Sequence, residues 1–314
     1  MKPADTNKIY LKPSSLKEAY NYACDYKKSF RYVAGGTDVF ANRFQGNDNS
    51  ECFIDLSGIE ELKGFENKKD YFRIGALNTL TEVIGNKHIN KEYNVLIDAA
   101  KMVASPLIRY RATLGGNLLC ENRCYYYNQS DWWRDSAGYC LKCEGSICIA
   151  TGSKKACYSE FVSDTAPALI SLNAEVVIYE SGEIKKYKLE DIYSSEGVNP
   201  KKIKPSDILI AVWIPSGMEF KSVYRKLRQR KSLEFTSLSS AVTINKNNVL
   251  KISLSGVDSG PVTYEGNTQS SSEEIIKFFL KISRAVENDM YSREYRREMI
   301  KVYISKSLKE LGLS

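Results

Sequence analysis

The sequence lacks the features of a membrane or exported protein, and it has almost no histidine. No apolar stretch reaches the roughly eighteen residues needed to span a bilayer, and residues 1–6 show no secretory signal. We therefore expect a cytoplasmic protein that does not contact a membrane. The single histidine, His88, lies in a polar stretch and is expected at the surface. A GxGxxG fingerprint is also missing, so a Rossmann domain is not predicted.

The sequence also lacks long segments that are rich in charge of one sign. Lys and Arg number 45 against 38 Asp and Glu, which gives a net charge of +7, and they are dispersed apart from a cluster at 225–231. A nucleic-acid-binding protein usually carries a stronger basic stripe, so we expect no nucleic-acid binding. An anionic cofactor or partner suits this charge better. A chain of 314 residues is long enough for two or three packed units.

Cysteine, in contrast, is concentrated in one region. Six of the eight cysteines fall between residues 120 and 157, whereas Cys24 and Cys52 stand alone and are expected to be small core residues. In a chain without an export signal, such crowding indicates metal binding rather than disulfides. Two kinds of site stay open: an iron–sulfur cluster, or a zinc site that uses the CxxC pair Cys140 and Cys143.

Local patterns predict an α+β fold. The N-terminal part alternates strands with a helix that Ser15 is expected to cap, and a second capping box begins at Thr79. From about residue 217 onward, paired strands and two amphipathic helices indicate a smaller α+β domain. The expected strands are 8–11, 32–34, 51–56, 72–75, 174–179, 207–214, 239–245 and 249–255, and the expected helices are 15–26, 94–104, 166–172, 271–287 and 292–311.

Two glycine pairs, Gly35-Gly36 and Gly115-Gly116, each predict a tight backbone turn. Glycine permits positive φ and lets another group approach the main chain closely. The N–H groups of such a turn form a concave anion site suited to a pyrophosphate. Thr37 would add a hydroxyl donor, and Asp38 would brace the turn or accept a hydrogen bond from a ribose. Plain structural turns are the alternative.

Five segments, in order, resemble the FAD subunit of the xanthine dehydrogenase and carbon monoxide dehydrogenase family of molybdenum hydroxylases. They are 34–38 (AGGTD), 74–76 (IGA), 112–117 (ATLGGN), 163–169 (SDTAPAL) and 295–297 (YRR). The resemblance covers most of the chain and implies a two-subdomain FAD-binding fold of the PCMH type. The units expected from it are FAD-binding subdomains at residues 1–56 and 57–216, followed by a C-terminal α+β domain at residues 217–314.

The resemblance also implies roles for individual residues. Residues 31–38 would wrap the FAD diphosphate, and residues 113–117 would form the opposite wall. Asp164 would contact FAD, or else cap a helix, and Lys226 would lie near the flavin ring, or else on the surface. Val103 and Ile210 would line the flavin, or else pack in the core. The FAD-contacting residues implied in this way are Arg31, Tyr32, Val33, Ala34, Gly35, Gly36, Thr37, Asp38, Val103, Thr113, Gly116, Asn117, Asp164, Ile210 and Lys226.

The cysteine-rich region forms an insert, at about residues 119–158, that ordinary members of the family lack. Within the insert, Cys124, Cys140, Cys148 and Cys157 are spaced C-x15-C-x7-C-x8-C. This spacing resembles the insert of the β subunit of 4-hydroxybenzoyl-CoA reductase, as do the YYY and WWR runs that follow Cys124. The resemblance implies that these four cysteines ligate a [4Fe–4S] cluster, with Cys120 and Cys143 as spare thiols.

These features imply a FAD-carrying electron-transfer subunit without a catalytic side chain of its own, since the cofactor performs the redox chemistry. The implied partners are a large molybdopterin subunit and a small subunit with two [2Fe–2S] clusters, in a hetero-oligomer. In the reductase subfamily a ferredoxin would supply electrons. The same parts would serve a hydroxylase of xanthine, nicotinate or an aldehyde. A stand-alone FAD oxidase and a zinc-stabilised scaffold are further alternatives.

Overall fold

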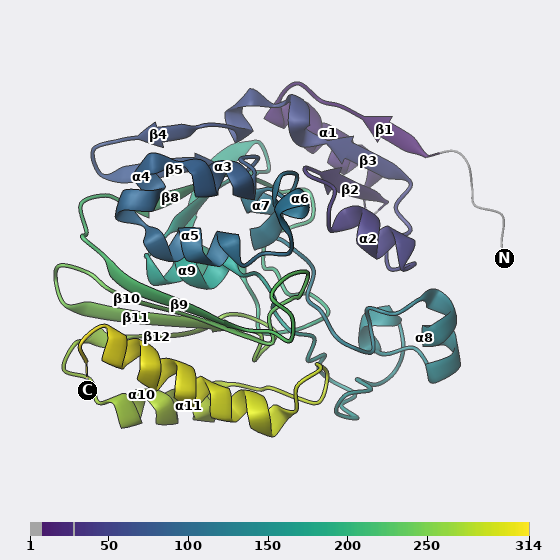
Figure 1. Cartoon of the computed structure of the whole chain (residues 1–314). Coiled ribbons are helices and arrows are strands. Elements are labelled where there is room, and N and C mark those ends of the chain that lie inside the picture. The colour runs from purple at the N-terminus through teal and green to yellow at the C-terminus, as the bar shows by residue number, and fades with distance from the viewer. Residues whose placement is uncertain (1–7, 28, 314) are drawn as a thin grey trace.

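The computed structural model describes residues 8–27 and 29–313, which form three β-sheets with helices packed around them (Figure 1). The expected mixture of helices and strands is confirmed. The strands of each sheet fall within one of the three ranges expected from the sequence. No helix in the described part of the chain is long and apolar enough to cross a membrane.

The N-terminal sheet is parallel, with strand order β1-β3-β2. Ser15 caps its first helix by accepting a hydrogen bond from the N–H of Glu18 at 3.2 Å, as predicted. Cys52 is fully buried, but the expectation for Cys24 is wrong: this thiol is exposed, because the helix buries the face that carries Ala19 and Ala23. The elements are β1 (Ile9–Leu11), α1 (Leu16–Tyr26), β2 (Phe30–Val33), α2 (Val39–Phe44) and β3 (Cys52–Asp55).

The central sheet has five antiparallel strands in the order β4-β5-β8-β6-β7. Thr79 and Glu82 form the predicted capping box at the start of α3. His88 is half-buried rather than a surface residue, because its ring stacks on Phe72 with 4.4 Å between centroids. The elements are β4 (Phe65–Asn67), β5 (Tyr71–Gly75), α3 (Leu80–Gly85), α4 (Lys87–Glu92), α5 (Asn94–Lys101), α6 (Pro106–Arg109), α7 (Leu114–Leu118), α9 (Thr165–Ser171), β6 (Glu175–Glu180), β7 (Glu183–Lys188) and β8 (Ile208–Pro215).

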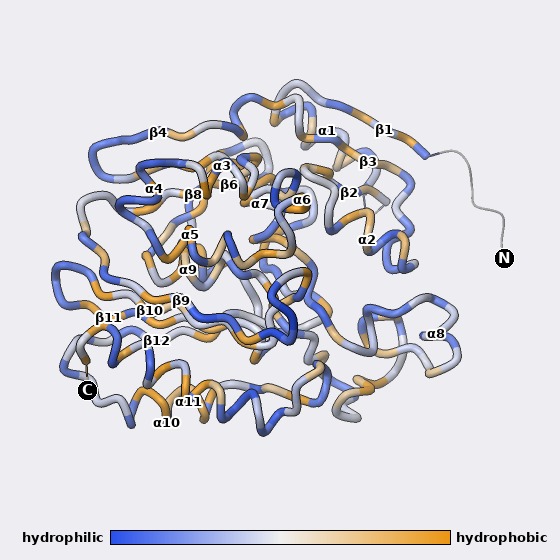
Figure 2. The backbone as a smooth tube through the Cα atoms, viewed as in Figure 1, coloured by the Kyte–Doolittle hydropathy of each residue, from blue (hydrophilic) through white to orange (hydrophobic). Residues whose placement is uncertain are grey.

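The C-terminal sheet is antiparallel, with strand order β12-β11-β10-β9, and both of its faces are covered. Helix α9 packs against β10 and β11, and α11 packs against β9 and β10, so every residue of β10 is buried. Figure 2 shows hydrophobic stretches along these packed elements and hydrophilic turns outside them. The elements are β9 (Lys221–Leu227), β10 (Leu238–Ile244), β11 (Val249–Ser255), β12 (Val262–Asn267), α10 (Ser272–Ile282) and α11 (Arg293–Glu310).

The predicted boundaries differ from the structure mainly at α10. This helix ends at Ile282 rather than near residue 287, because Ser283 takes an extended conformation. Beyond it, Arg296 of α11 is fully buried and pairs with Glu160, the second residue after the insert. Its guanidinium also donates to the carbonyl of Gly256 at 2.9 Å. Arg296 therefore fastens the last helix to the end of the insert.

The insert lies at one side of the molecule, with α8 (Asp131–Ala137) at its outer end (Figure 1). Apart from α8 and a single short 3-10 turn at Leu141–Cys143, this region is irregular loop. Isolated bridges hold it together, pairing Arg123 with Glu160 and Cys140 with Ile147.

Candidate cofactor cleft and cysteine cavity

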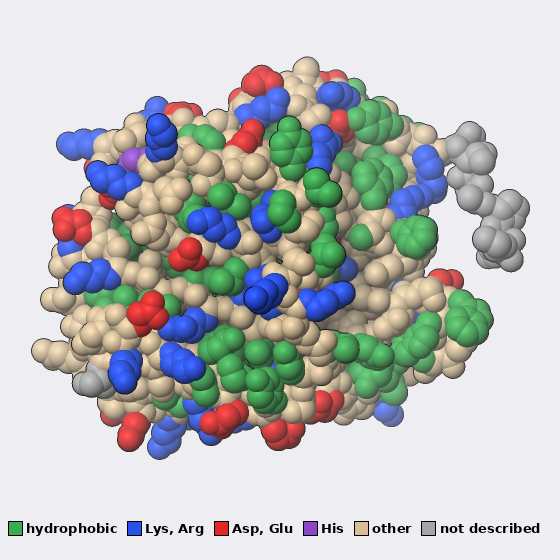
Figure 3. All heavy atoms as spheres, in the orientation of Figure 1, with side chains coloured by type: hydrophobic (Ala, Val, Ile, Leu, Met, Phe, Trp, Pro, Cys, Tyr) green, Lys and Arg blue, Asp and Glu red, His purple; other side chains and the backbone are tan. Residues whose placement is uncertain are grey.

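A cleft of about 730 Å³ lies between the N-terminal sheet and the rest of the molecule. Segments 34–39 and 112–117 line it, together with the loop at 198–205 and residues 233–235. On the face shown in Figure 3, the surface is hollowed where hydrophobic and basic side chains gather. Its volume falls within the range of sites for small molecules and cofactors, roughly 300–1,000 Å³.

The first glycine pair forms the predicted tight turn directly after β2. Gly36 has φ +74°, a conformation that residues with a Cβ rarely adopt. Gly35 packs against another backbone segment: a Cβ built on it would lie 1.9 Å from the carbonyl oxygen of Arg111. The two walls of the cleft therefore meet at Gly35 with no room for a side chain.

The second glycine pair does not form a tight turn, so that prediction is wrong. Gly115 and Gly116 lie in the short helix α7, and neither has a positive φ. Thr113 caps this helix, since its Oγ1 accepts from the N–H of Gly116 at 3.1 Å. The capping hydroxyl makes a helical turn favourable here in spite of the glycines.

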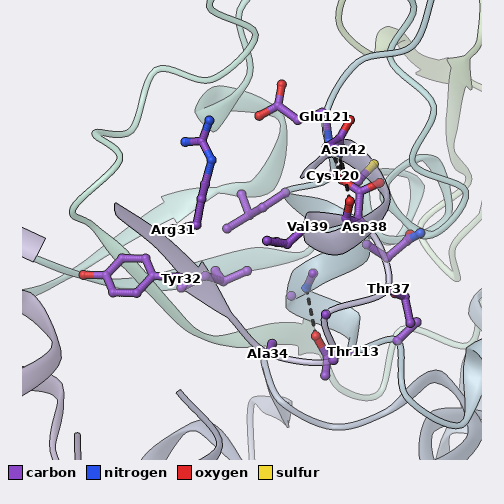
Figure 4. A pocket seen from close by; sticks show the side chains of 18 of the residues that line it. Arg31, Tyr32, Ala34, Thr37, Asp38, Val39, Asn42, Thr113, Cys120 and Glu121 are labelled. Carbon is purple, nitrogen blue, oxygen red and sulfur yellow. Dashed lines mark hydrogen bonds between the residues drawn. The ribbon is translucent and has the colours of Figure 1, made fainter. Parts of the chain in front are cut away.

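Asp38 braces the first glycine turn against the insert, one of the two roles expected for it. Its carboxylate pairs with Arg123 and accepts from the side-chain amide of Asn42 at 3.1 Å. Figure 4 shows Asp38, Asn42, Cys120 and Glu121 gathered at one end of the cleft, with Thr37 and Thr113 toward the other. Burial and the neighbouring Asp38 carboxylate raise the pKa of the Cys120 thiol to about 12.

Asn117 joins α7 to the start of α9. Its Oδ1 accepts from the hydroxyl of Thr165 at 2.6 Å, from the N–H of Thr165 at 3.1 Å and from the hydroxyl of Ser163 at 3.1 Å. These contacts place Asp164, which lies between the two, at the wall of the cleft.

Asp164 and Lys226 form a buried ion pair, although 62 residues separate them. Nζ of Lys226 lies 2.7 Å from Oδ2 of Asp164, and the two side chains are 0% and 5% exposed. Lys226 is therefore not a surface residue. Asp164 stands at the N-cap of α9, but its side chain makes no capping hydrogen bond. Burial raises the pKa of Asp164, and the ammonium of Lys226 opposes that rise.

Most residues predicted to contact FAD line this one cleft, although they come from three separate parts of the chain. Three do not: Val33 and Ile210 are buried side chains of β2 and β8, and Lys226 reaches the cleft only through Asp164. The predicted residues that line the cleft are Arg31, Tyr32, Ala34, Gly35, Gly36, Thr37, Asp38, Val103, Thr113, Gly116, Asn117 and Asp164.

Several polar residues of the cleft were missed by the sequence reasoning. Glu121 lies 3.4 Å from both Lys142 and Lys201, and all three line the cleft. The loop at 198–205 also lines it and supplies Lys204. The signal for this loop was a run of lysines between two prolines, Pro200 and Pro205, on an otherwise dispersed charge background. No local sequence pattern distinguishes Glu121 or Lys142 from the other charged residues of the chain.

A second, smaller cavity lies inside the insert. Cys124, Cys140, Cys148 and Cys157, the four predicted ligands, all line it. Cys120 lines the large cleft instead, and Cys143 lines neither cavity. Within the described residues, no three His, Cys, Asp or Glu side chains are grouped closely enough to hold a single metal ion.

Backbone N–H groups face three of the four thiols of this cavity, those of Cys124, Cys140 and Cys157. Burial raises the pKa of Cys124 to about 11, and the N–H groups of Tyr126 and Tyr127 oppose the rise. A hydrogen bond from the Cys143 thiol lowers the pKa of Cys140, helped by the N–H groups of residues 142 and 143. The N–H of Ser159 lies 3.5 Å from Sγ of Cys157. Hydrogen bonds of this kind surround cysteine-bound iron–sulfur clusters and tune their potential.

Comparison with known proteins identifies the family. The model of a family described as "FAD binding domain in molybdopterin dehydrogenase" matches residues 4–217. The chain belongs to this family. Like its relatives, this FAD-binding protein is a subunit of a molybdenum hydroxylase-type oxidoreductase.

Two relatives and one solved structure show how far the likeness extends. The aldehyde oxidoreductase FAD-binding subunit PaoB of Escherichia coli is 30% identical over 74% of this chain and 76% of its own length. The nicotinate dehydrogenase FAD-subunit of Eubacterium barkeri is 24% identical over 75% of this chain and 68% of its own. A chain of the reconstituted CO dehydrogenase from Oligotropha carboxidovorans is 18% identical, with a TM-score of 0.76 over 96% of both chains, which confirms the fold.

Proposed function

We propose that the cleft holds FAD with its diphosphate between segment 34–38 and residues 113–117. Three features support this placement. The turn at Gly35 and Gly36 keeps side chains away from one wall, Lys201 and Lys204 supply positive charge, and Val103 and Ala104 supply apolar surface. Asp164, fixed by Lys226, would stand beside the cofactor. The flavin supplies the redox chemistry when bound, and these residues orient it.

We further propose that Cys124, Cys140, Cys148 and Cys157 ligate a [4Fe–4S] cluster. The observation that carries this proposal is that the four thiols line one cavity, although 33 residues separate the first from the last and their spacing is irregular. The two other insert cysteines lie outside that cavity. Cysteine thiolates are the usual ligands of such a cluster, so a set of four thiols around one cavity fits it chemically.

The chain would then pass electrons between this cluster, FAD and the [2Fe–2S] clusters of a small partner subunit, within a complex that includes a large molybdopterin subunit. The insert favours a 4-hydroxybenzoyl-CoA reductase-like enzyme, in which a ferredoxin donates electrons. The names of the relatives favour a second candidate, an aldehyde-, nicotinate- or xanthine-type hydroxylase in which electrons leave by the same route. The two candidates share the FAD site and differ in the direction of electron flow.

Metal and flavin analysis of anaerobically purified chain tests both sites. We expect one FAD and about four iron atoms per chain, as one cubane cluster requires. A chain that contains zinc and no iron would contradict the cluster proposal but not the FAD proposal. A chain that binds no flavin when flavin is supplied would contradict the assignment of the cleft to FAD. The direction of electron flow is tested in the assembled enzyme. In a reductase-type enzyme, reduced ferredoxin should reduce the flavin. If only the substrate of the molybdenum subunit reduces it, the hydroxylase candidate is correct.

A further inference from the structure

Two residues of the insert border both cavities. Tyr127 and Lys142 line the cleft proposed for FAD and also line the cysteine cavity. Both are withdrawn from solvent, since Tyr127 is 8% exposed and the side chain of Lys142 only 5%. The two cavities therefore share a wall, and that wall contains a positive charge.

The ammonium of Lys142 is held in this wall from four sides. It lies over the ring of Tyr127, 4.9 Å from the centroid. Its Nζ lies 3.1 Å from the carbonyl oxygen of Gly197, 3.4 Å from that of Asn122 and 3.4 Å from Oε2 of Glu121. A cation packed in this way has lost most of its water, so its field is screened less than that of a surface lysine.

The contact with Gly197 brings this charge next to a proposed cluster ligand. The N–H of Gly197 donates to the carbonyl of Cys157 at 3.1 Å, and a Cβ on Gly197 would lie 2.8 Å from Sγ of Cys157. Lys142 is therefore close enough to act on the charge of the sulfur ligands.

The surroundings of Lys142 leave its charge only partly neutralised. Glu121 is the carboxylate paired with Lys142, but its other oxygen lies 3.4 Å from Nζ of Lys201. One negative charge is thus shared between two lysines. Of these two, only Lys142 borders the cysteine cavity.

We infer that Lys142, positioned by Tyr127 and Glu121, is the residue of this wall that sets the reduction potential of the cysteine-bound centre relative to FAD. The inference rests on the proposed [4Fe–4S] cluster and FAD. Lys142 gains and loses neither a proton nor an electron in this role. Its fixed positive charge favours the reduced centre, which carries one more negative charge, and so opposes release of the electron toward the cleft.

The test measures the potential of the iron–sulfur centre, by a redox titration followed by EPR, in the anaerobically purified full chain. Lys142→Met should keep iron and FAD but lower the potential, so that the ratio of oxidised to reduced centre at a fixed applied potential rises about tenfold, as removal of one nearby buried charge predicts. Lys142→Arg, which keeps the charge, should stay close to the wild type.

Lys155→Met is the matched control, because it removes an exposed lysine of the same insert, two residues before Cys157. It should change the potential of the centre much less. Glu121→Gln removes the negative charge and should shift the potential in the opposite direction, which keeps the test decisive if Lys142→Met loses its iron. The inference is overturned if Glu121→Gln and Lys142→Met leave the potential unchanged, or if Lys155→Met shifts it as much as Lys142→Met does. A wild-type chain that binds no iron would instead overturn the proposed cluster.

Discussion

The cleft and the insert are stabilised in different ways. Residues that line the cleft also belong to two hydrophobic core clusters, such as Val103 and Ala112 in one and Phe30 and Leu56 in the other. The insert contributes no residue between 120 and 158 to those clusters, although the structure describes this range in full. Its buried side chains are instead cysteines, Tyr127 and polar residues such as Asn122, Arg123 and Arg134.

This difference predicts which region would depend on its proposed cofactor for folding. A region without an apolar core usually needs a metal or disulfides to be stable, and metal-binding free energy then becomes folding free energy. The cleft is organised by the protein alone, through the packing of Gly35 and the buried pair of Asp164 and Lys226. If the proposed cofactors are correct, loss of FAD should leave the fold intact, whereas loss of the proposed cluster should unfold the insert.

The largest expected effect is on the cleft. Gly35→Val would force a side chain against the carbonyl of Arg111, so the two walls would separate and FAD binding should be lost. The measurement is the flavin content of the purified variant. Gly85→Val is the control, since a Cβ at Gly85 meets nothing within 4 Å. Normal flavin content in Gly35→Val would show that the diphosphate does not bind at this turn.

The next effect concerns the insert. Cys148→Ala should abolish iron binding and make the insert sensitive to proteolysis, while FAD remains bound, because the cleft has its own core. Iron analysis, flavin analysis and limited proteolysis with mass mapping check this. Cys143→Ala is the matched control and should keep its iron, because Cys143 lies outside the cysteine cavity. Equal iron loss in both variants would contradict the assignment of ligands.

A third effect tests whether the cleft is stable through its own contacts. Lys226→Met leaves the charge of Asp164 buried without a partner, and this should lower the free energy of unfolding by about 3–5 kcal/mol. Urea denaturation at neutral pH measures the change. The double variant Lys226→Met, Asp164→Asn should recover a large part of it. If the double variant is as unstable as the single one, packing of the lysine chain rather than the ion pair accounts for the loss.

The smallest effect lies at the boundary between the two regions. Lys201, Lys142 and Arg31 outweigh burial and lower the pKa of Glu121 to about 2. The folded-state pKa is thus below the unfolded value, so this group stabilises the fold above about pH 4.5 and loses that contribution as the pH falls toward 2. Because its side chain is 36% exposed, we discount the contribution to about 1 kcal/mol. Urea denaturation from pH 7 to pH 3 should show Glu121→Gln losing less stability than the wild type.

Much of the fold followed from local signals. Ser15 and Thr79 cap helices where their patterns predict, because a capping hydrogen bond spans only three residues. Strands β8, β10 and β11 were also predicted, because each is a short run rich in apolar and β-branched residues, whereas β9 and β12 were missed because charged and polar residues interrupt them. Cys24 and His88 were misplaced because their neighbours in sequence do not reveal which face of a helix packs inward, or that Phe72 lies beside the histidine ring.

The sequence indicated which residues lie together better than it indicated their conformation. The tight turn at Gly36 was predicted, and the four cysteines that line one cavity were singled out, because their residue types and spacing are unusual in themselves. Gly115 and Gly116 were assigned the wrong conformation, since the cap at Thr113 outweighs the turn preference of glycine. Glu121, Lys142 and Lys201 were missed because charged residues are common, and only their burial beside one another marks them.

The sequence by itself determined the family, the tight turn at Gly36 and the set of cysteines, because these depend on residue type and on spacing along the chain. Only the tertiary structure decided that Lys226 is buried against Asp164, and that Lys142 stands between the cleft and the cysteine cavity. The physical reason is the same in both cases. Burial and pairing of a charge arise from contacts between segments that are distant in sequence, and no local pattern encodes which segments will meet.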